Sequence, residues 1–214
     1  MIYNPNCKLW LPFEGNALDA SGNDNNGNVH GATLASGKFG QCYNFNGTSS
    51  YIEIPYSAST RPTYDMTLCA WASAANWQQT SNQRMISCYK TGGWYLGNTS
   101  TNIIFNVRCG TADYNCYISA SSIAIGWHHI AAVKSGRYIY LYIDGIMVAD
   151  NDMGDAKAIS YAYNNSLMLG VAAGTGTSPD NVYFYNGLID DVMIFNIALS
   201  SGNIRRIMMG LHPL

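Results

Sequence analysis

Oxygen-bearing side chains concentrate in one early loop of the sequence. Residues 19–28 contain Asp19, Asn23, Asn26 and Asn28 together with two glycines and one serine. Carboxylate, amide and backbone carbonyl oxygens are the ligands that Ca²⁺ prefers, so one interpretation of this loop is a structural calcium site. The alternative is a series of Asx turns in which backbone N–H groups satisfy Asp19.

The tyrosines are the second set of candidate functional residues, and the chain has sixteen of them. Tyr138, Tyr140 and Tyr142 alternate with aliphatic residues over residues 137–143, which predicts a ladder on the outer face of a sheet. A tyrosine face suits stacking on sugar rings or burial in a protein interface. The alternative is a face that contacts water or is covered by a loop. Six further aromatic residues lie in or near expected loops and are candidates to line a binding mouth: Trp77, Trp94, Tyr161, Tyr163, Tyr183 and Tyr185.

Two adjacent histidines share one strand-like run. His128 and His129 follow Trp127, so one must face the core and the other must face outward. We expect the inward histidine to be hydrogen-bonded within the fold. A role in binding is the alternative.

Acidic residues are poorly placed for glycoside hydrolysis, which needs two carboxyl groups a few ångströms apart. The chain has only two glutamates, Glu14 and Glu53, far apart in sequence. Asp190 and Asp191 are adjacent, and adjacent strand residues point to opposite faces. The sequence therefore predicts a protein that is not an enzyme, with a glycoside-active enzyme as the remaining alternative.

Composition excludes several classes of function. The chain has 214 residues, of which 48% are hydrophobic and 11% charged, enough for a sizeable core. A net charge of -2 provides no basic surface for nucleic acid. No apolar run approaches the roughly 20 residues that span a bilayer, so we expect no membrane insertion. No signal peptide is recognisable at the start.

Cysteine usage indicates reduced thiols. The six cysteines include no Cys-x-x-Cys pair, which argues against zinc. Cys42, Cys69 and Cys88 lie in apolar runs, where cysteine behaves as a small buried hydrophobe. Cys109 and Cys116 flank an expected turn and are the alternative, a disulfide to test first.

Short strands must position all of these groups. Residues 127–150 predict three antiparallel strands, with turns at 134–136 and 144–145. An Asn-Gly turn at 46–47 predicts a further hairpin between residues 39–45 and 50–54. Other expected strands are residues 8–13, 66–72, 84–89, 94–96, 102–107, 114–118, 167–171, 182–185 and 188–195. A capped helix is expected at 201–209, closed by Gly210. The predicted fold is all-β, a single-domain antiparallel jelly-roll β-sandwich over residues 1–214 with a short C-terminal helix.

Several motifs occur in an order typical of one family. They are residues 45–47 (Phe-Asn-Gly), 50–54 (Ser-Tyr-Ile-Glu-Ile), 67–71 (Thr-Leu-Cys-Ala-Trp), 127–131 (Trp-His-His-Ile-Ala), 141–145 (Leu-Tyr-Ile-Asp-Gly), 186–195 (Asn-Gly-Leu-Ile-Asp-Asp-Val-Met-Ile-Phe) and 199–204 (Leu-Ser-Ser-Gly-Asn-Ile). From about Leu9 to Ile207 the chain resembles the laminin-G-like branch of the concanavalin A-like lectins and glucanases. The resemblance implies two curved sheets, often a structural calcium ion, and binding of glycans or proteins. It also implies that Asp19 and Asp190 would supply the charge of the calcium site.

These observations lead us to expect a non-catalytic structural and recognition module on a larger assembly. The expected assembly is a phage virion surface, where the chain would be a decoration, fibre or tail protein with protein neighbours, in an oligomer, that also binds glycans. The alternative is a free, lectin-like carbohydrate-binding domain. Either would act at a virion surface, at a cell surface or in the extracellular space.

Overall fold

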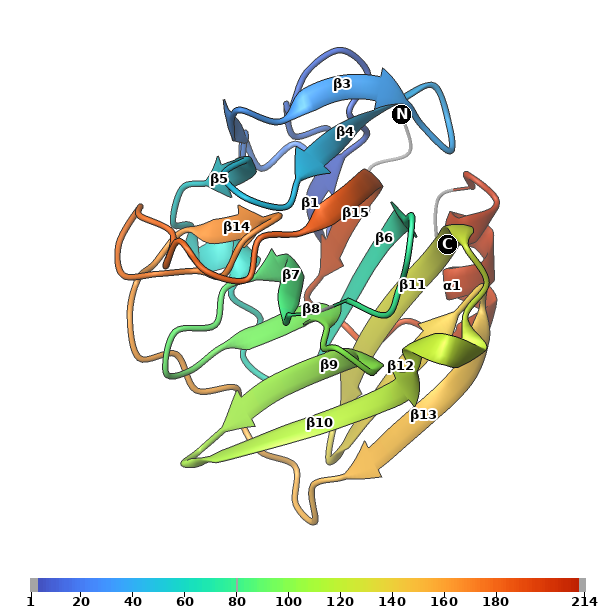
Figure 1. Ribbon diagram of the computed structural model, residues 1–214. Coiled ribbons are helices and arrows are strands. Elements are labelled where there is room, and N and C mark those ends of the chain that lie inside the picture. Colours follow the sequence, from blue (N-terminus) through green and yellow to red (C-terminus); the bar gives the residue numbers. More distant parts are fainter. Residues whose placement is uncertain (1–3, 80, 212–214) are drawn as a thin grey trace.

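A computed structural model describes residues 4–79 and 81–211, and shows two antiparallel sheets packed face to face (Figure 1). The ends of the predicted domain, residues 1–3 and 212–214, lie outside the described residues. The first sheet has eight strands, and β1 pairs with β15 beside the main path. In spatial order its strands are β13 (Ile146–Asp152), β12 (Tyr138–Ile143), β11 (Gly126–Ser135), β6 (Met66–Ala74), β15 (Asn186–Phe195), β4 (Gln41–Asn46) and β3 (Thr33–Ser36), with β1 (Cys7–Leu11).

The second sheet has seven strands. Their order is β10 (Ala112–Ser119), β9 (Asn102–Cys109), β8 (Trp94–Asn98), β7 (Gln83–Ser87), β14 (Leu167–Leu169), β5 (Tyr51–Ile54) and β2 (Asn28–His30). Two short 3₁₀ turns, η1 (Ala58–Thr60) and η2 (Ala120–Ser122), join strands. The predicted jelly-roll sandwich is therefore confirmed as a fold class.

The largest apolar cluster lies between the two sheets and follows from strand alternation. In β12, Ile139, Leu141 and Ile143 are buried in this cluster, while the tyrosines between them are half-buried on the other face. The hairpin of β12 and β13 turns at Asp144 and Gly145, which have φ angles of 50° and 73°. The three antiparallel strands expected in residues 127–150 are confirmed.

The hairpin expected between residues 39–45 and 50–54 is wrong. β4 pairs with β15 and β3 in the first sheet, whereas β5 pairs with β14 and β2 in the second. The connection crosses from one sheet to the other. Asn46 Oδ1 accepts hydrogen bonds from the backbone N–H groups of Thr48, Ser49 and Ser50, which holds the crossing in place.

Residues 182–185 also differ from expectation, because they form no strand. Asn181 and Tyr183 adopt φ angles of 55° and 61°, and left-handed residues interrupt an extended chain. The segment instead folds over the outer face of the second sheet, where Phe184 packs against Met168 and Val171.

A helix adds a third layer on the outer face of the first sheet. The helix α1 (Ser201–Met208) is capped by Ser200, whose Oγ accepts a hydrogen bond from the backbone N–H of Asn203. Ile204 and Ile207 bury against a second apolar cluster that includes Phe195 and Val133, and α1 stands beside β11 in Figure 1. Among the described residues, no helix has the length and apolar character needed to cross a membrane.

The six cysteines are free and buried. Cys109 lies opposite Ala112, and Cys116 lies opposite Phe105, so the two are not cross-strand partners in the β9–β10 hairpin. Burial raises the pKa of the Cys88 thiol to about 11 and that of Cys116 to about 12. These thiols behave as small apolar side chains.

Candidate functional site

A pocket of about 340 Å³ lies where the 170–185 segment meets the outer face of the second sheet. We call it the Arg84 pocket. Arg84 comes from β7, the next side chains come from the turn after β7, and the others come from the 170–185 segment. Its lining residues are Arg84, Tyr89, Lys90, Thr91, Ala172, Asp180 and Tyr183.

Strand alternation brings Arg84 and Tyr95 to the same face. In β8, Trp94 and Leu96 point into the core, so Tyr95 between them points outward beside Arg84. Gly97 lies opposite Arg84 in the β7–β8 pair, and a Cβ at Gly97 would collide with the carbonyl oxygen of Gln83. Glycine at this position therefore allows the close strand approach beneath the pocket.

The guanidinium of Arg84 makes cation–π contacts with two tyrosine rings. Its central carbon lies 3.7 Å from the ring centroid of Tyr95 and 4.9 Å from that of Tyr183. Tyr89 meets Tyr95 edge-on, with their ring centroids 5.5 Å apart. Cation–π contacts of this kind fix the plane of the guanidinium. The backbone N–H of Arg84 also donates to the carbonyl oxygen of Tyr183 at 2.9 Å, which ties the 170–185 segment to β7.

Charges in and beside the pocket are mostly paired. Lys90 Nζ lies 2.6 Å from Asp180 Oδ1. The Tyr89 hydroxyl donates to Asp113 Oδ1 at 2.9 Å. Burial raises the pKa of both Tyr89 and Tyr95, so their hydroxyl groups stay protonated and can donate hydrogen bonds at neutral pH. Burial lowers the pKa of the Arg84 guanidinium.

The backbone around the pocket is strained. Thr91, Asn181 and Tyr183 have φ angles of 56°, 55° and 61°. A left-handed conformation is uncommon for non-glycine residues and a clear outlier for β-branched Thr91. Such outliers cluster at ligand sites, where the surrounding structure compensates for them. This makes the pocket the strongest candidate site among the described residues. Its aromatic faces and fixed donors can bind and orient a polar ligand.

Of the aromatic residues predicted to line a mouth, Tyr183 lies in the pocket and is 42% exposed. The prediction is wrong for Trp77, Trp94 and Tyr185, which are fully buried. Their polar tips are satisfied inside the fold, because Trp77 Nε1 donates to Ala124 O and the Tyr185 hydroxyl donates to Ser73 O.

Tyr161 and Tyr163 lie outside the Arg84 pocket. The Tyr161 hydroxyl donates to Pro62 O and accepts from Trp94 Nε1, and burial raises its pKa well above the usual value. Tyr161 is therefore a structural residue. Tyr163 is exposed but is not among the residues that line the pocket.

The ladder of Tyr138, Tyr140 and Tyr142 lies on the outer face of the first sheet. Tyr138 and Tyr140 stack with ring centroids 6.0 Å apart. Tyr140 and Tyr142 pack against the apolar cluster beneath α1. The geometry favours the alternative of a covered face.

The early loop does not fit a calcium ion. Asp19 Oδ1 accepts from the N–H groups of Trp10 and Ser21, and Oδ2 accepts from Ser21 Oγ and the N–H of Asn25. These four donors occupy the lone pairs that a cation would need. The Asn26 amide oxygen accepts from the N–H of Asp19. The Asn23 amide N–H groups donate to Cys7 O and Ser21 Oγ. The Asn28 amide N–H donates to Glu53 Oε2.

Asp190 has a different set of partners. Its Oδ2 accepts from the N–H groups of Lys38 and Phe39 at 2.9 and 3.1 Å, and its Oδ1 accepts from Asp191 N–H at 2.8 Å. Burial raises the pKa of Asp190 to about 7 although these hydrogen bonds lower it. Asp190 thus holds the turn before β4. Among residues 4–79 and 81–211, no three or more His, Cys, Asp or Glu side chains form a group that could hold a metal.

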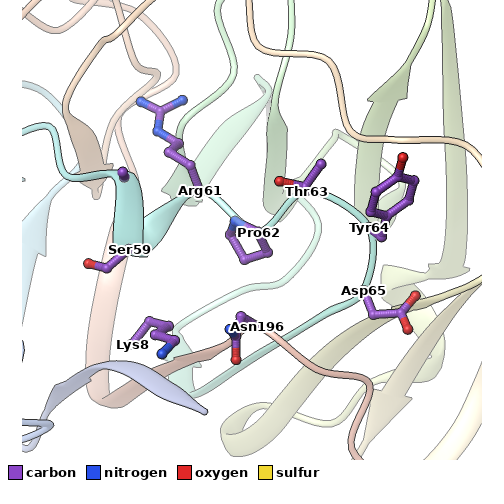
Figure 2. A pocket seen from close by; sticks show the side chains of 9 residues that line it. Lys8, Ser59, Arg61, Pro62, Thr63, Tyr64, Asp65 and Asn196 are labelled. Carbon is purple, nitrogen blue, oxygen red and sulfur yellow. The ribbon is translucent and has the colours of Figure 1, made fainter. Parts of the chain in front are cut away.

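A second pocket, of about 480 Å³, lies between the segment after η1 and the strands β1 and β15 (Figure 2). Its polar groups serve the fold. Lys8 Nζ donates to Pro5 O, and Asp65 accepts from Gly136 N–H. Arg61 points away from Lys8 in Figure 2 and stacks on Tyr161. Tyr64 is the one aromatic residue in its lining, so this pocket offers no paired rings.

The two histidines face opposite sides of the first sheet, and His129, on the outer side, is the more buried, with no hydrogen-bond partner for its ring nitrogens among the described residues. His128 is the inward one, with Nδ1 2.7 Å from Asp144 Oδ2 and Nε2 3.0 Å from Ala124 O. The prediction of a hydrogen-bonded inward histidine is confirmed. His129 is buried on the other face beside Trp71, and burial lowers its pKa to about 4.

The glutamates are not arranged as a catalytic pair. Glu53 is buried on β5, where its oxygens accept from Ser166 Oγ and Asn28 Nδ2. Glu14 is exposed and accepts from Gln41 N–H. Each carboxylate has a structural role in its own region.

Sequence reasoning missed Arg84, Tyr89, Tyr95 and Asp180. The outward position of Tyr95 between Trp94 and Leu96 was a usable signal, since it follows from alternation. The position of Asp180 had no sequence signal, because it depends on the path of the 170–185 segment.

A family model for the concanavalin A-like lectin/glucanases superfamily matches residues 46–205. The chain therefore belongs to this superfamily, as the motifs predicted. No curated protein sequence matches the chain.

Solved structures with the same fold include binding domains of bacterial toxins. The binding domain of Paraclostridial Mosquitocidal Protein 1 is 17% identical, with a TM-score of 0.74, and the match covers 95% of this chain and 52% of that one. The binding domain of Botulinum neurotoxin DC, in complex with rat synaptotagmin II, is 14% identical, with a TM-score of 0.76 and coverage of 97% and 52%. The chain thus spans about half the length of these domains.

A third match has nearly the same length as the chain. Domain 4 of AbnA, a GH43 extracellular arabinanase from Geobacillus stearothermophilus, in complex with arabinotriose, is 17% identical. Its TM-score is 0.67, and the match covers 94% of this chain and 98% of that one. At these identities the likeness shows the fold.

Proposed function

We propose that this chain is a non-catalytic module that binds glycans in the Arg84 pocket. The observation that carries the proposal is the contact of Arg84 with the rings of Tyr95 and Tyr183, in a pocket where Tyr183 and two neighbouring residues have left-handed backbone. Tyrosine faces suit the apolar faces of sugar rings, and the hydroxyl and guanidinium groups suit sugar hydroxyls.

The family and the related structures support this proposal. One structure of the same fold is a domain in complex with arabinotriose, and another comes from a neurotoxin whose cell entry depends on two ganglioside molecules. The absence of a catalytic role is likewise a proposal, and it is supported by the structural roles of Glu14 and Glu53.

A glycan array followed by calorimetry tests the proposal. We expect saturable binding of at least one glycan, weakened about fivefold by Tyr183→Ala or Tyr89→Ala, because loss of one stacking contact removes about 1 kcal/mol. Tyr64→Ala is the matched control, since Tyr64 is 60% exposed and lines the other pocket. Glycan binding that survives both pocket variants, or is lost with Tyr64→Ala, would contradict the assignment.

A role among protein neighbours in a larger assembly is a second proposal. β10 and β13 are adjoining strands at the ends of the two sheets, and Asn151 Nδ2 donates to Asn115 O between them. They carry the exposed apolar side chains Tyr117, Ile146 and Met147. Exposed apolar groups on adjoining strands favour a protein contact. A phage virion surface remains the assembly that we predict.

Light scattering tests the assembly proposal. We expect a molar mass above that of one chain, reduced by Ile146→Lys. A mass of one chain at all concentrations would argue for the free lectin-like alternative.

A further inference from the structure

We infer that the Arg84 pocket selects sugars that carry a carboxylate, such as uronic or sialic acids. The inference rests on the glycan-binding function proposed above and names the class of ligand.

The charge balance of the pocket carries the first step. Lys90 and Asp180 neutralise each other at 2.6 Å. Asp113, beside the pocket, is paired with Arg108 at 2.8 Å. Among the described residues no carboxylate pairs with Arg84, so the pocket has one cation in excess.

The donors of Arg84 carry the second step. A guanidinium has five N–H donors, and within residues 4–79 and 81–211 the Arg84 side chain makes one hydrogen bond, from Nη1 to Gln83 O at 3.3 Å. Tyr95 and Tyr183 contact the guanidinium through their rings, and with one hydrogen bond to the described residues its other N–H donors remain for a further partner. A planar fork of parallel N–H groups matches the two oxygens of a carboxylate better than it matches a sugar hydroxyl.

The burial of Arg84 carries the third step. The side chain is half-buried, and burial without a counter-ion disfavours its charged form. A ligand carboxylate would supply that counter-ion, while the ring of the sugar contacts Tyr183 or Tyr89. A neutral sugar would gain the ring contact alone.

Matched pairs of sugars test the inference on the full chain. The probes are glucuronic acid and glucose, galacturonic acid and galactose, and sialyllactose and lactose. We expect one acidic member to bind at least tenfold more tightly than its neutral partner. Raising the salt from about 50 to about 500 mM should reduce this preference, because salt screens the ion pair.

Variants identify the residue responsible. Arg84→Gln should abolish the acidic preference, whereas Arg84→Lys should keep part of it. Arg137→Gln is the control, because Arg137 is paired with Asp152 on the other sheet and should not affect binding. Circular dichroism checks the fold of each variant, and if Arg84→Gln does not fold, the salt dependence of the unaltered chain decides.

The outcomes separate this inference from the proposed function. Equal binding of acidic and neutral sugars, or tighter binding of a sulfated than a carboxylated sugar, would overturn the carboxylate preference and leave glycan binding intact. An acidic preference that persists in Arg84→Gln would also overturn it. No binding of any sugar in the panel or on the array would overturn both.

Discussion

Burial changes the pKa of individual side chains in this protein. Asp190 is the clearest example, since burial raises its pKa to about 7 while three backbone N–H groups hold it in place. Its ordinary pKa is 3.8, so the folded chain binds the proton more tightly than the unfolded chain. The contribution of Asp190 to stability is therefore full below about pH 4 and is lost as the pH rises through about 7.

We predict that this titration appears in the free energy of unfolding. Between pH 5 and pH 8 the unaltered chain should lose about 1–3 kcal/mol through Asp190, and Asp190→Asn should lack that loss. Urea denaturation at both pH values measures it. Asp155→Asn is the control, because Asp155 is exposed. Equal pH dependence in the unaltered chain and Asp190→Asn would refute the assignment.

Individual residues also show where sequence reasoning ends. The inward position of His128 follows from alternation along β11. The burial of Trp94 follows from the same rule, so the prediction that Trp94 lines a binding mouth is wrong. Arg84 and Tyr183 are 99 positions apart in the sequence, and their contact depends on the left-handed backbone of Tyr183. No local sequence pattern predicts such a contact.

Among the secondary-structure elements, α1 lies on the same side of the first sheet as Tyr138, Tyr140 and Tyr142 of β12. It covers the outer side of the first sheet, where Ile204 is fully buried beside Phe195 and Val133. Tyr140 and Tyr142 of β12 pack against this cluster, so they lie on a face that the protein itself partly covers.

We predict that Ile204→Ala destabilises the chain by about 2–5 kcal/mol, because it removes a buried side chain and leaves a cavity. Met209→Ala, at the exposed end of the helix, should change stability by less than about 0.5 kcal/mol. Thermal or urea denaturation of both variants checks this. Similar small effects in both would mean that α1 does not dock as described.

Strands and their pairing could be predicted from the sequence where alternation and turn residues lie close together in the chain. The strands in residues 127–150 combine alternation with an Asp-Gly turn, and both features lie within one hairpin. The crossing at residues 46–50 carries a similar turn signal, yet β4 and β5 belong to different sheets. The pairing of β4 with β15 is decided by packing across the whole chain, which a local pattern does not contain.

For the molecule as a whole, we predict that stability does not depend on a metal in the early loop. Asp19 is satisfied by four donors of the protein itself. We predict that millimolar calcium chloride and excess chelator give the same melting temperature. A rise with calcium that the chelator reverses would restore the calcium site, since a ligand that binds the folded state stabilises it.

The central claim is that the Arg84 pocket is the binding site, and locating a bound sugar tests it most directly. The measurement is a nuclear magnetic resonance titration of chain labelled in its tyrosine rings and arginine side chains, with the best glycan from the array. We predict saturable shifts at Tyr89, Tyr95, Tyr183 and Arg84, with Tyr64 and Tyr140 unchanged. Shifts confined to Tyr64, or to the tyrosines of β12, would contradict the account.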